Sequence, residues 1–163
     1  MKPIIIGYDG SEGAKGAIAF AGDYFAGRRA VVVTAFEHWP PAVQGDESQV
    51  DEQTRAETAA KAEEGAALAR AVGIEAEAMT IHASEDKTWQ SIIRVADELD
   101  AGPIVVGSHG FNGLRPLVLG SVSHQLAHHA HQPVIAVPTP VAVAARREQK
   151  QDSANTTAEH AHH

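Results

Sequence analysis

The chain has 163 residues, which is enough for one domain with a hydrophobic core and too few for two domains of ordinary size. Its formal net charge of −8 at pH 7 disfavours nucleic acid as a partner, because such a surface repels phosphates and no basic stripe offsets it. The lack of cysteine excludes disulfides, thiolate chemistry and cysteine-based zinc sites.

The N-terminal sequence MKPIIIGYDG carries a short apolar run before its first glycine. A secretory signal needs an apolar region of about 7–15 residues. No run in the chain approaches the roughly 18 apolar residues of a membrane span. We therefore expect a cytoplasmic protein that does not enter a membrane.

The first half of the chain alternates between strand and helix patterns. Residues 3–8 are apolar and β-branched, and they end at Asp9-Gly10, which predicts a buried strand that runs into a turn. Apolar residues then recur at helical spacing up to Gly27, and residues 30–36 form a second apolar run. An alanine-rich stretch from about Val50 to Val72 predicts a long helix.

The second half repeats this alternation. Residues 74–82 alternate apolar with polar side chains, as expected of a half-exposed or edge strand. A helix over residues 89–99, a strand over 103–107, a short helix over 121–131 and a final strand over 133–138 complete the pattern.

This β-α alternation with continuous apolar strands predicts an α/β fold, in which helices cover both faces of one parallel sheet. The periodic pattern ends near Pro138. We therefore expect one domain over residues 1–138 and a disordered tail over residues 139–163.

The most informative stretch is GSHGFNGLRPLVLGSVS, residues 107–123, between a predicted strand and a predicted helix. Glycine allows close approach to the backbone, and a helix that opens at Gly120-Ser121 presents unpaired N–H groups to an anion. If the strands before Asp9 and Gly107 are neighbours, Asp9 faces this loop across one crevice. The pattern indicates a phosphate cradle that is neither a Walker loop nor a dinucleotide fingerprint. The alternative is that the glycines only form turns and begin a helix.

The spacing Gly107-x2-Gly110-x9-Gly120-Ser121, together with PVIAVP and the opening Asp-Gly-Ser, resembles the ATP-binding type of universal stress protein. The resemblance covers residues 2–138. It implies a five-stranded parallel sheet in the order 3-2-1-4-5, a Rossmann-like fold of the adenine nucleotide alpha hydrolase type. It also implies a homodimer formed through the last strand, residues 133–138.

The resemblance further implies that the protein binds ATP, with Mg²⁺, as a nucleotide-dependent stress sensor. The implied cofactor-binding residues divide by the part of the nucleotide they meet. Asp9 contacts the ribose with Gly107 nearby, the backbone of Ala35 meets the adenine, and the phosphates lie against Gly110, Gly120, Ser121, Val122 and Ser123. His109, inside the loop, is a further candidate for approach to the nucleotide.

Two alternatives to a nucleotide sensor stay open. One is a slow ATP hydrolase of the same fold, although no conspicuous lysine and arginine constellation supports fast phosphoryl transfer. The other is a dimeric interaction module that binds no nucleotide.

Three further groups of residues have a structural interpretation that we favour over a functional one. His124, His128 and His131 could share a helix face, and we interpret them as exposed or rim histidines. Trp89 with Ile92 and Ile93 is interpreted as core packing rather than as part of a cofactor site. Lys15 and Arg115 are interpreted as solvated surface cations.

Overall fold

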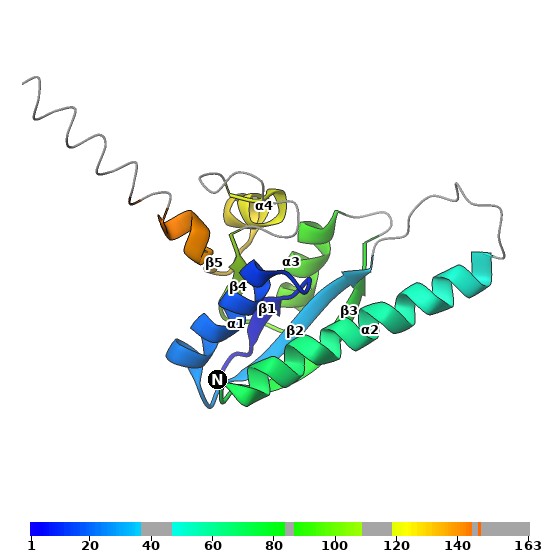
Figure 1. Ribbon diagram of the computed structural model, residues 1–163, viewed down its shortest axis with the longest axis horizontal. Helices are drawn as coiled ribbons and strands as arrows, with labels where there is room; N and C mark the ends of the chain where they lie inside the picture. The colour runs from blue at the N-terminus through cyan, green and yellow to red at the C-terminus, as the bar shows by residue number, and fades with distance from the viewer. Residues whose placement is uncertain (37–46, 84–86, 109–118, 145–146, 148–163) are drawn as a thin grey trace, which may run out of the picture.

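The computed structural model describes residues 1–36, 47–83, 87–108, 119–144 and 147, with the backbone alone for residues 47–51. Strands and helices alternate along the chain (Figure 1). The elements are β1 (Ile4–Gly7), α1 (Glu12–Phe25), β2 (Arg29–Phe36), α2 (Glu47–Ala71), β3 (Glu75–His82), α3 (Thr88–Glu98), β4 (Ile104–Gly107), α4 (Ser121–His129) and β5 (Val134–Val137).

The five strands form one parallel sheet in the order β3-β2-β1-β4-β5, which confirms the predicted fold class and strand order. The inner strands β1 and β4 are buried on both faces, as their continuous apolar sequences predict. Strand β3 lies at an edge, where Ala76 and Ile81 are buried while Glu75 and Glu77 are exposed. Its alternating sequence therefore predicted its place in the sheet.

Helices cover both faces of the sheet, and each face has its own core. Helices α1 and α2 pack on one face, over a cluster that includes Ile4, Ile6 and Val32. Helices α3 and α4 pack on the other, over a cluster that includes Ile5, Val33 and Leu126. Figure 1 shows α2 lying along β2 and reaching past its end.

The ends of α1 and α2 follow from local chemistry. Ser11 caps α1, because its side chain accepts a hydrogen bond from the Ala14 N–H at 3.2 Å. Helix α2 stops before Gly73, whose φ of +87° lies in the left-handed region that glycine adopts without strain.

The chain beyond β5 differs from its predicted state at its beginning. Residues 140–144, assigned from sequence to a disordered tail, are helical, and Ala142 is fully buried. Thr139 accepts a hydrogen bond from the Ala142 N–H at 3.2 Å, and Pro140 suits the first helical position. The Thr-Pro pair was therefore a helix-start signal. Residues 148–163 lie outside the described part of the chain.

Candidate functional site

The site predicted from sequence lies where the direction of winding of the sheet reverses. Strands β1 and β4 are neighbours, with Ile5 opposite Ile104 and Ile6 opposite Val105. The chain continues from β1 to β2 on one side of this point, and from β4 to β5 on the other. Ligands of open parallel sheets bind outside the carboxyl ends of the strands at such a point. The required adjacency of the two loop-bearing strands is therefore present.

Asp9 lies just after β1, at the carboxyl end of the strand that pairs with β4. It is exposed, and its Oδ1 accepts a hydrogen bond from the Ser11 N–H at 2.9 Å. Gly10 between them has a φ of +83°, which a residue with a side chain adopts only with strain. Within the described chain, Asp9 makes this one side-chain hydrogen bond, so its second oxygen can accept from a ligand.

The two ends of the glycine loop are tied together at its base. The Gly120 N–H donates to the Ser108 carbonyl at 2.6 Å, and the Ser123 hydroxyl lies 3.1 Å from the same oxygen. The Ser108 N–H donates in turn to the Val137 carbonyl of β5 at 2.8 Å. Ser123 is only 3% exposed, so its hydroxyl is used within the protein and is not offered to a ligand.

Helix α4 begins beside the end of β4, and no side chain of the described residues caps its first N–H groups. Gly120 is its N-cap residue and supplies no side-chain acceptor, and the His124 N–H is the first to bond within the helix, at 2.9 Å from the Gly120 carbonyl. The N–H groups of Ser121, Val122 and Ser123 therefore lack an intrahelical acceptor. Helix α1 differs, because Ser11 caps it. The start of α4 is thus the helix end at this crevice that can accept an anion.

Gly107 has a packing role that its motif did not reveal. A Cβ at this position would lie 2.5 Å from the carbonyl carbon of Gly13 and 2.7 Å from its oxygen. The end of β4 therefore touches the backbone of the first turn of α1. No side chain fits there, so the glycine is explained by helix–strand packing whether or not a ligand approaches.

The remaining predicted residues fall into two groups. Ala35 is half-buried near the end of β2, opposite Ile81, and Val122 is half-buried against the core, so each would offer its backbone to a ligand. His109 and Gly110 lie outside the described residues.

Residues set aside at the sequence level also have defined places. His124 and His128 are exposed with ring centroids 4.6 Å apart, and the described residues contain no group of three or more histidines and carboxylates suited to a metal ion. Lys15 pairs with Glu12 at 2.9 Å on the surface, and this hydrogen bond raises the pKa of the lysine. Arg115 lies outside the described residues.

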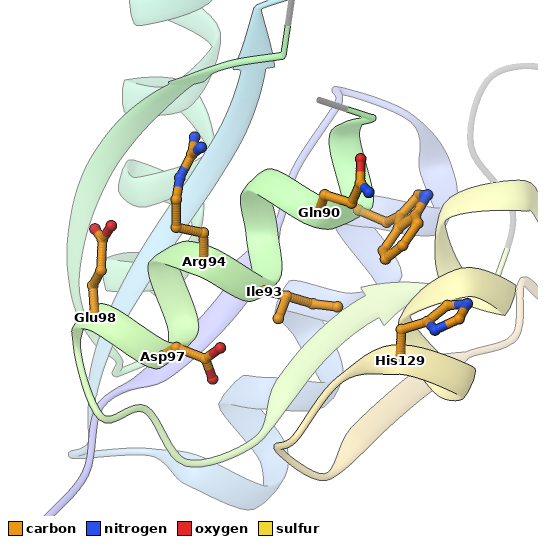
Figure 2. Close-up of a pocket in the computed structure, with 7 residues that line it drawn as sticks. Gln90, Ile93, Arg94, Asp97, Glu98 and His129 are labelled. Atoms are coloured by element: carbon orange, nitrogen blue, oxygen red, sulfur yellow. The ribbon is translucent and has the colours of Figure 1, made fainter. Parts of the chain in front are cut away.

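Trp89 is half-buried against the core rather than enclosed by it, and its ring stacks on that of His129, with centroids 4.8 Å apart. The two rings belong to a pocket of about 360 Å³ (Figure 2). The labelled side chains in Figure 2 come from α3, except His129, which comes from α4. The pocket is lined by Trp89, Gln90, Ile93, Arg94, Asp97, Glu98 and His129. It contains none of the residues predicted to bind nucleotide.

Comparison with known proteins gives a consistent family match. The model of the universal stress protein family matches residues 1–138. Universal stress protein YxiE of Bacillus subtilis (strain 168) is 40% identical over 65 residues, which cover 40% of this chain and 42% of that protein. Universal stress protein Slr1101 of Synechocystis sp. is 42% identical over 72 residues, which cover 44% of this chain and 64% of that protein. The aligned segments thus span less than two thirds of either relative.

Solved structures share the fold. Hypothetical protein MJ0577 superposes with a TM-score of 0.70 at 21% identity, covering 83% of this chain and 94% of that one. A universal stress protein in complex with cAMP superposes with a TM-score of 0.60 at 24% identity, covering 85% of this chain and 97% of that one. The universal stress protein of Archaeoglobus fulgidus in complex with dAMP superposes with a TM-score of 0.56 at 24% identity, covering 84% of this chain and 98% of that one.

Proposed function

The chain belongs to the universal stress protein family, and on that premise we propose that the crevice between β1 and β4 binds an adenine nucleotide. The observation that carries the proposal is that α4 begins beside the end of β4, the neighbour of the strand that Asp9 follows, with no capping side chain from the described residues. Phosphate oxygens would accept hydrogen bonds from the N–H groups of Ser121 to Ser123, which lack intrahelical acceptors, and would be stabilised by the helix dipole.

The rest of the nucleotide would lie across the end of the sheet. The free oxygen of Asp9 is suited to accept a hydrogen bond from a ribose hydroxyl, and the backbone of Ala35 lies two strands from β4, where an adenine would reach. Two relatives of the same fold were crystallised with the adenine nucleotides cAMP and dAMP, which supports the proposed ligand class.

We propose ATP with Mg²⁺ as the ligand in particular. Mg²⁺ keeps several waters and takes its protein ligands from one or two carboxylates together with substrate phosphates. The described residues contain no group of three or more metal-binding side chains, so we propose that the ion would be held mainly by the triphosphate. Gly110 and His109, which lie outside the described residues, are proposed to contribute further contacts to the nucleotide.

The proposed role is that of a nucleotide-dependent stress regulator that works as a homodimer through residues 133–138. Strand β5 is a sheet edge, and all four of its residues are half-buried, whereas three of the four residues of β4 are buried. Pairing with a second copy would cover this edge and its unpaired backbone groups. Among the described residues, no helix combines the length and the hydropathy that a membrane span requires.

Calorimetric titration of the nucleotide-free protein with ATP and Mg²⁺ tests the proposal. Gly120→Val should abolish binding, because its side chain would stand where the phosphates approach, while a φ of −60° and ψ of 158° allow valine without strain. Gly16→Val is the matched control, since a Cβ there meets no atom within 4 Å. No binding heat from the wild-type protein, or equal binding by Gly120→Val, would refute the proposed site.

A further inference from the structure

A chain of hydrogen bonds links the residue before Asp9 to strand β2 on one side and to helix α2 on the other. The Tyr8 N–H donates to the Val33 carbonyl at 2.9 Å, and the Thr34 hydroxyl donates to the Tyr8 carbonyl at 2.8 Å. The Tyr8 phenol donates to a carboxylate oxygen of Glu64 at 2.6 Å. Tyr8 is therefore held by its N–H, its carbonyl and its side chain at once.

The Tyr8 ring has little room to shift. It is 3% exposed and lies under α2, where a Cβ on Gly65 would be 2.6 Å from the Tyr8 Cδ1 atom and 2.9 Å from the Val32 Cγ1 atom. The glycine lets α2 press directly on the ring. Burial, and then the hydrogen bond to Glu64, raise the pKa of Tyr8, so the phenol remains a donor at neutral pH.

Thr34 acts at the point where the regular ladder between β1 and β2 ends. The last paired residues are Gly7 and Val33, and the Thr34 side chain, 3% exposed, reaches beyond them to the Tyr8 carbonyl. That carbonyl lies in the same planar peptide unit as the Asp9 N–H and Cα. A hydroxyl that fixes this plane therefore also fixes the position of the Asp9 Cα atom and narrows the directions in which the Asp9 side chain can leave the backbone.

We infer that Thr34 and the Tyr8–Glu64 pair are positioning residues that set the orientation of the Asp9 carboxylate toward the ribose of a bound nucleotide. This inference rests on the proposed function. It adds that recognition of the sugar depends on Tyr8 under α2, on Glu64 in α2 and on Thr34 in β2, none of which touches the ligand. The packing of α2 on the sheet would therefore influence how the nucleotide binds.

The test compares the affinities of the full chain for ATP and for 2′,3′-dideoxy-ATP, both with Mg²⁺, by calorimetry. Because a ribose hydroxyl would donate a hydrogen bond to a charged carboxylate, the wild-type protein should bind ATP about 10-fold or more tightly than 2′,3′-dideoxy-ATP. Thr34→Val should bring the two affinities together, and Thr34→Ser, which keeps the hydroxyl, should restore the preference. A merely structural role would lower stability without changing this ratio.

Thr58→Val is the matched control. Thr58 is also buried, and its hydroxyl also donates to a backbone carbonyl at 2.8 Å, that of Thr54, but it lies within α2. This variant should keep the wild-type preference for ATP.

A second pair of variants covers the case in which Thr34→Val does not fold. Tyr8→Phe keeps the ring and removes only the hydrogen bond to Glu64, so it should also lower the ratio of the affinity for ATP to that for 2′,3′-dideoxy-ATP. Tyr24→Phe, at an exposed position, should leave this ratio unchanged. If the wild-type protein prefers ATP and the folded variants all keep that preference, the inference is wrong and the proposed function survives. If the wild-type protein binds neither nucleotide, the proposed function fails and the inference falls with it.

Discussion

Replacing Gly107 by alanine tests whether this motif glycine is required by packing or by a ligand. A Cβ at residue 107 would lie at 2.5, 2.7 and 2.9 Å from three backbone atoms of Gly13. Real Cβ atoms do not come this close to other atoms. Since backbone atoms cannot rotate away, the end of β4 and the first turn of α1 would have to separate.

The expected cost is at the upper end of the range for overpacking, about 3 kcal/mol in the free energy of unfolding. For a domain of this size, 1 kcal/mol shifts the melting temperature by about 2–4 °C, so Gly107→Ala should melt about 6–12 °C below the wild-type protein. Urea unfolding of the nucleotide-free protein measures the free energy directly.

Gly16→Ala is the control, because it lies in the same helix α1 and a Cβ there meets nothing within 4 Å. It should stabilise the protein by up to about 1 kcal/mol, since alanine is a better helix former than glycine. The reasoning would be refuted if Gly107→Ala left the stability of the nucleotide-free protein unchanged. Weaker nucleotide binding at unchanged stability would show instead that the glycine serves the ligand.

Three further changes have expected outcomes. Burial raises the pKa of Tyr8, so at alkaline pH the folded protein retains a proton that the unfolded chain releases. The resulting contribution to the free energy of unfolding is complete below the ordinary pKa of 10.0 and declines as the pH rises above it. Tyr8→Phe should flatten the alkaline limb of the stability profile measured by urea unfolding, and an unaltered limb would contradict this. Hydrogen bonds from Gln132 and then His131 lower the pKa of Asp97 from its ordinary 3.8. The wild-type protein should therefore be more stable than Asp97→Asn above pH 3.8, and this difference in stability should vanish as the pH falls through the folded-state pKa. A constant difference across this range would count against the assignment. The carbonyls of Pro133 and Val137 accept hydrogen bonds from N–H groups in and directly after β4. Because backbone groups point to alternate sides along a strand, the N–H of Ala136 faces the open edge of the sheet. Ala136→Pro should therefore yield folded monomers in analytical ultracentrifugation, whereas an intact dimer would place the interface elsewhere.

The sequence determined much of the fold for identifiable reasons. Short apolar runs bounded by turn residues, such as residues 3–8 and 103–107, favour buried strands, and the alternation in residues 74–82 favours a half-exposed or edge strand. The strand order came from the family resemblance, and the adjacency of β1 and β4 agrees with the independent expectation that two loops meet at one crevice.

Features that depend on how distant segments approach were not predictable from local patterns. Ser123 stands in a motif that resembles a phosphate site, yet its hydroxyl turns toward the Ser108 carbonyl because α4 packs over the base of its own loop. Gly107 meets the backbone of Gly13, and the Tyr8 phenol meets Glu64, only once α1 and α2 dock on the sheet. The motif therefore predicts a site at this end of the sheet, but it does not reveal which contacts Ser123, Gly107 and Tyr8 make within the protein.

The most direct test of the central claim is the change in backbone amide resonances of the ¹⁵N-labelled protein on addition of ATP and Mg²⁺. We expect shifts at Asp9 and Gly10 and at Ser121, Val122 and Ser123, with little change at Trp89 and His129 in the α3–α4 pocket. Shifts confined to that pocket, or no shifts at saturating nucleotide, would contradict the assignment of the β1–β4 crevice as the nucleotide site.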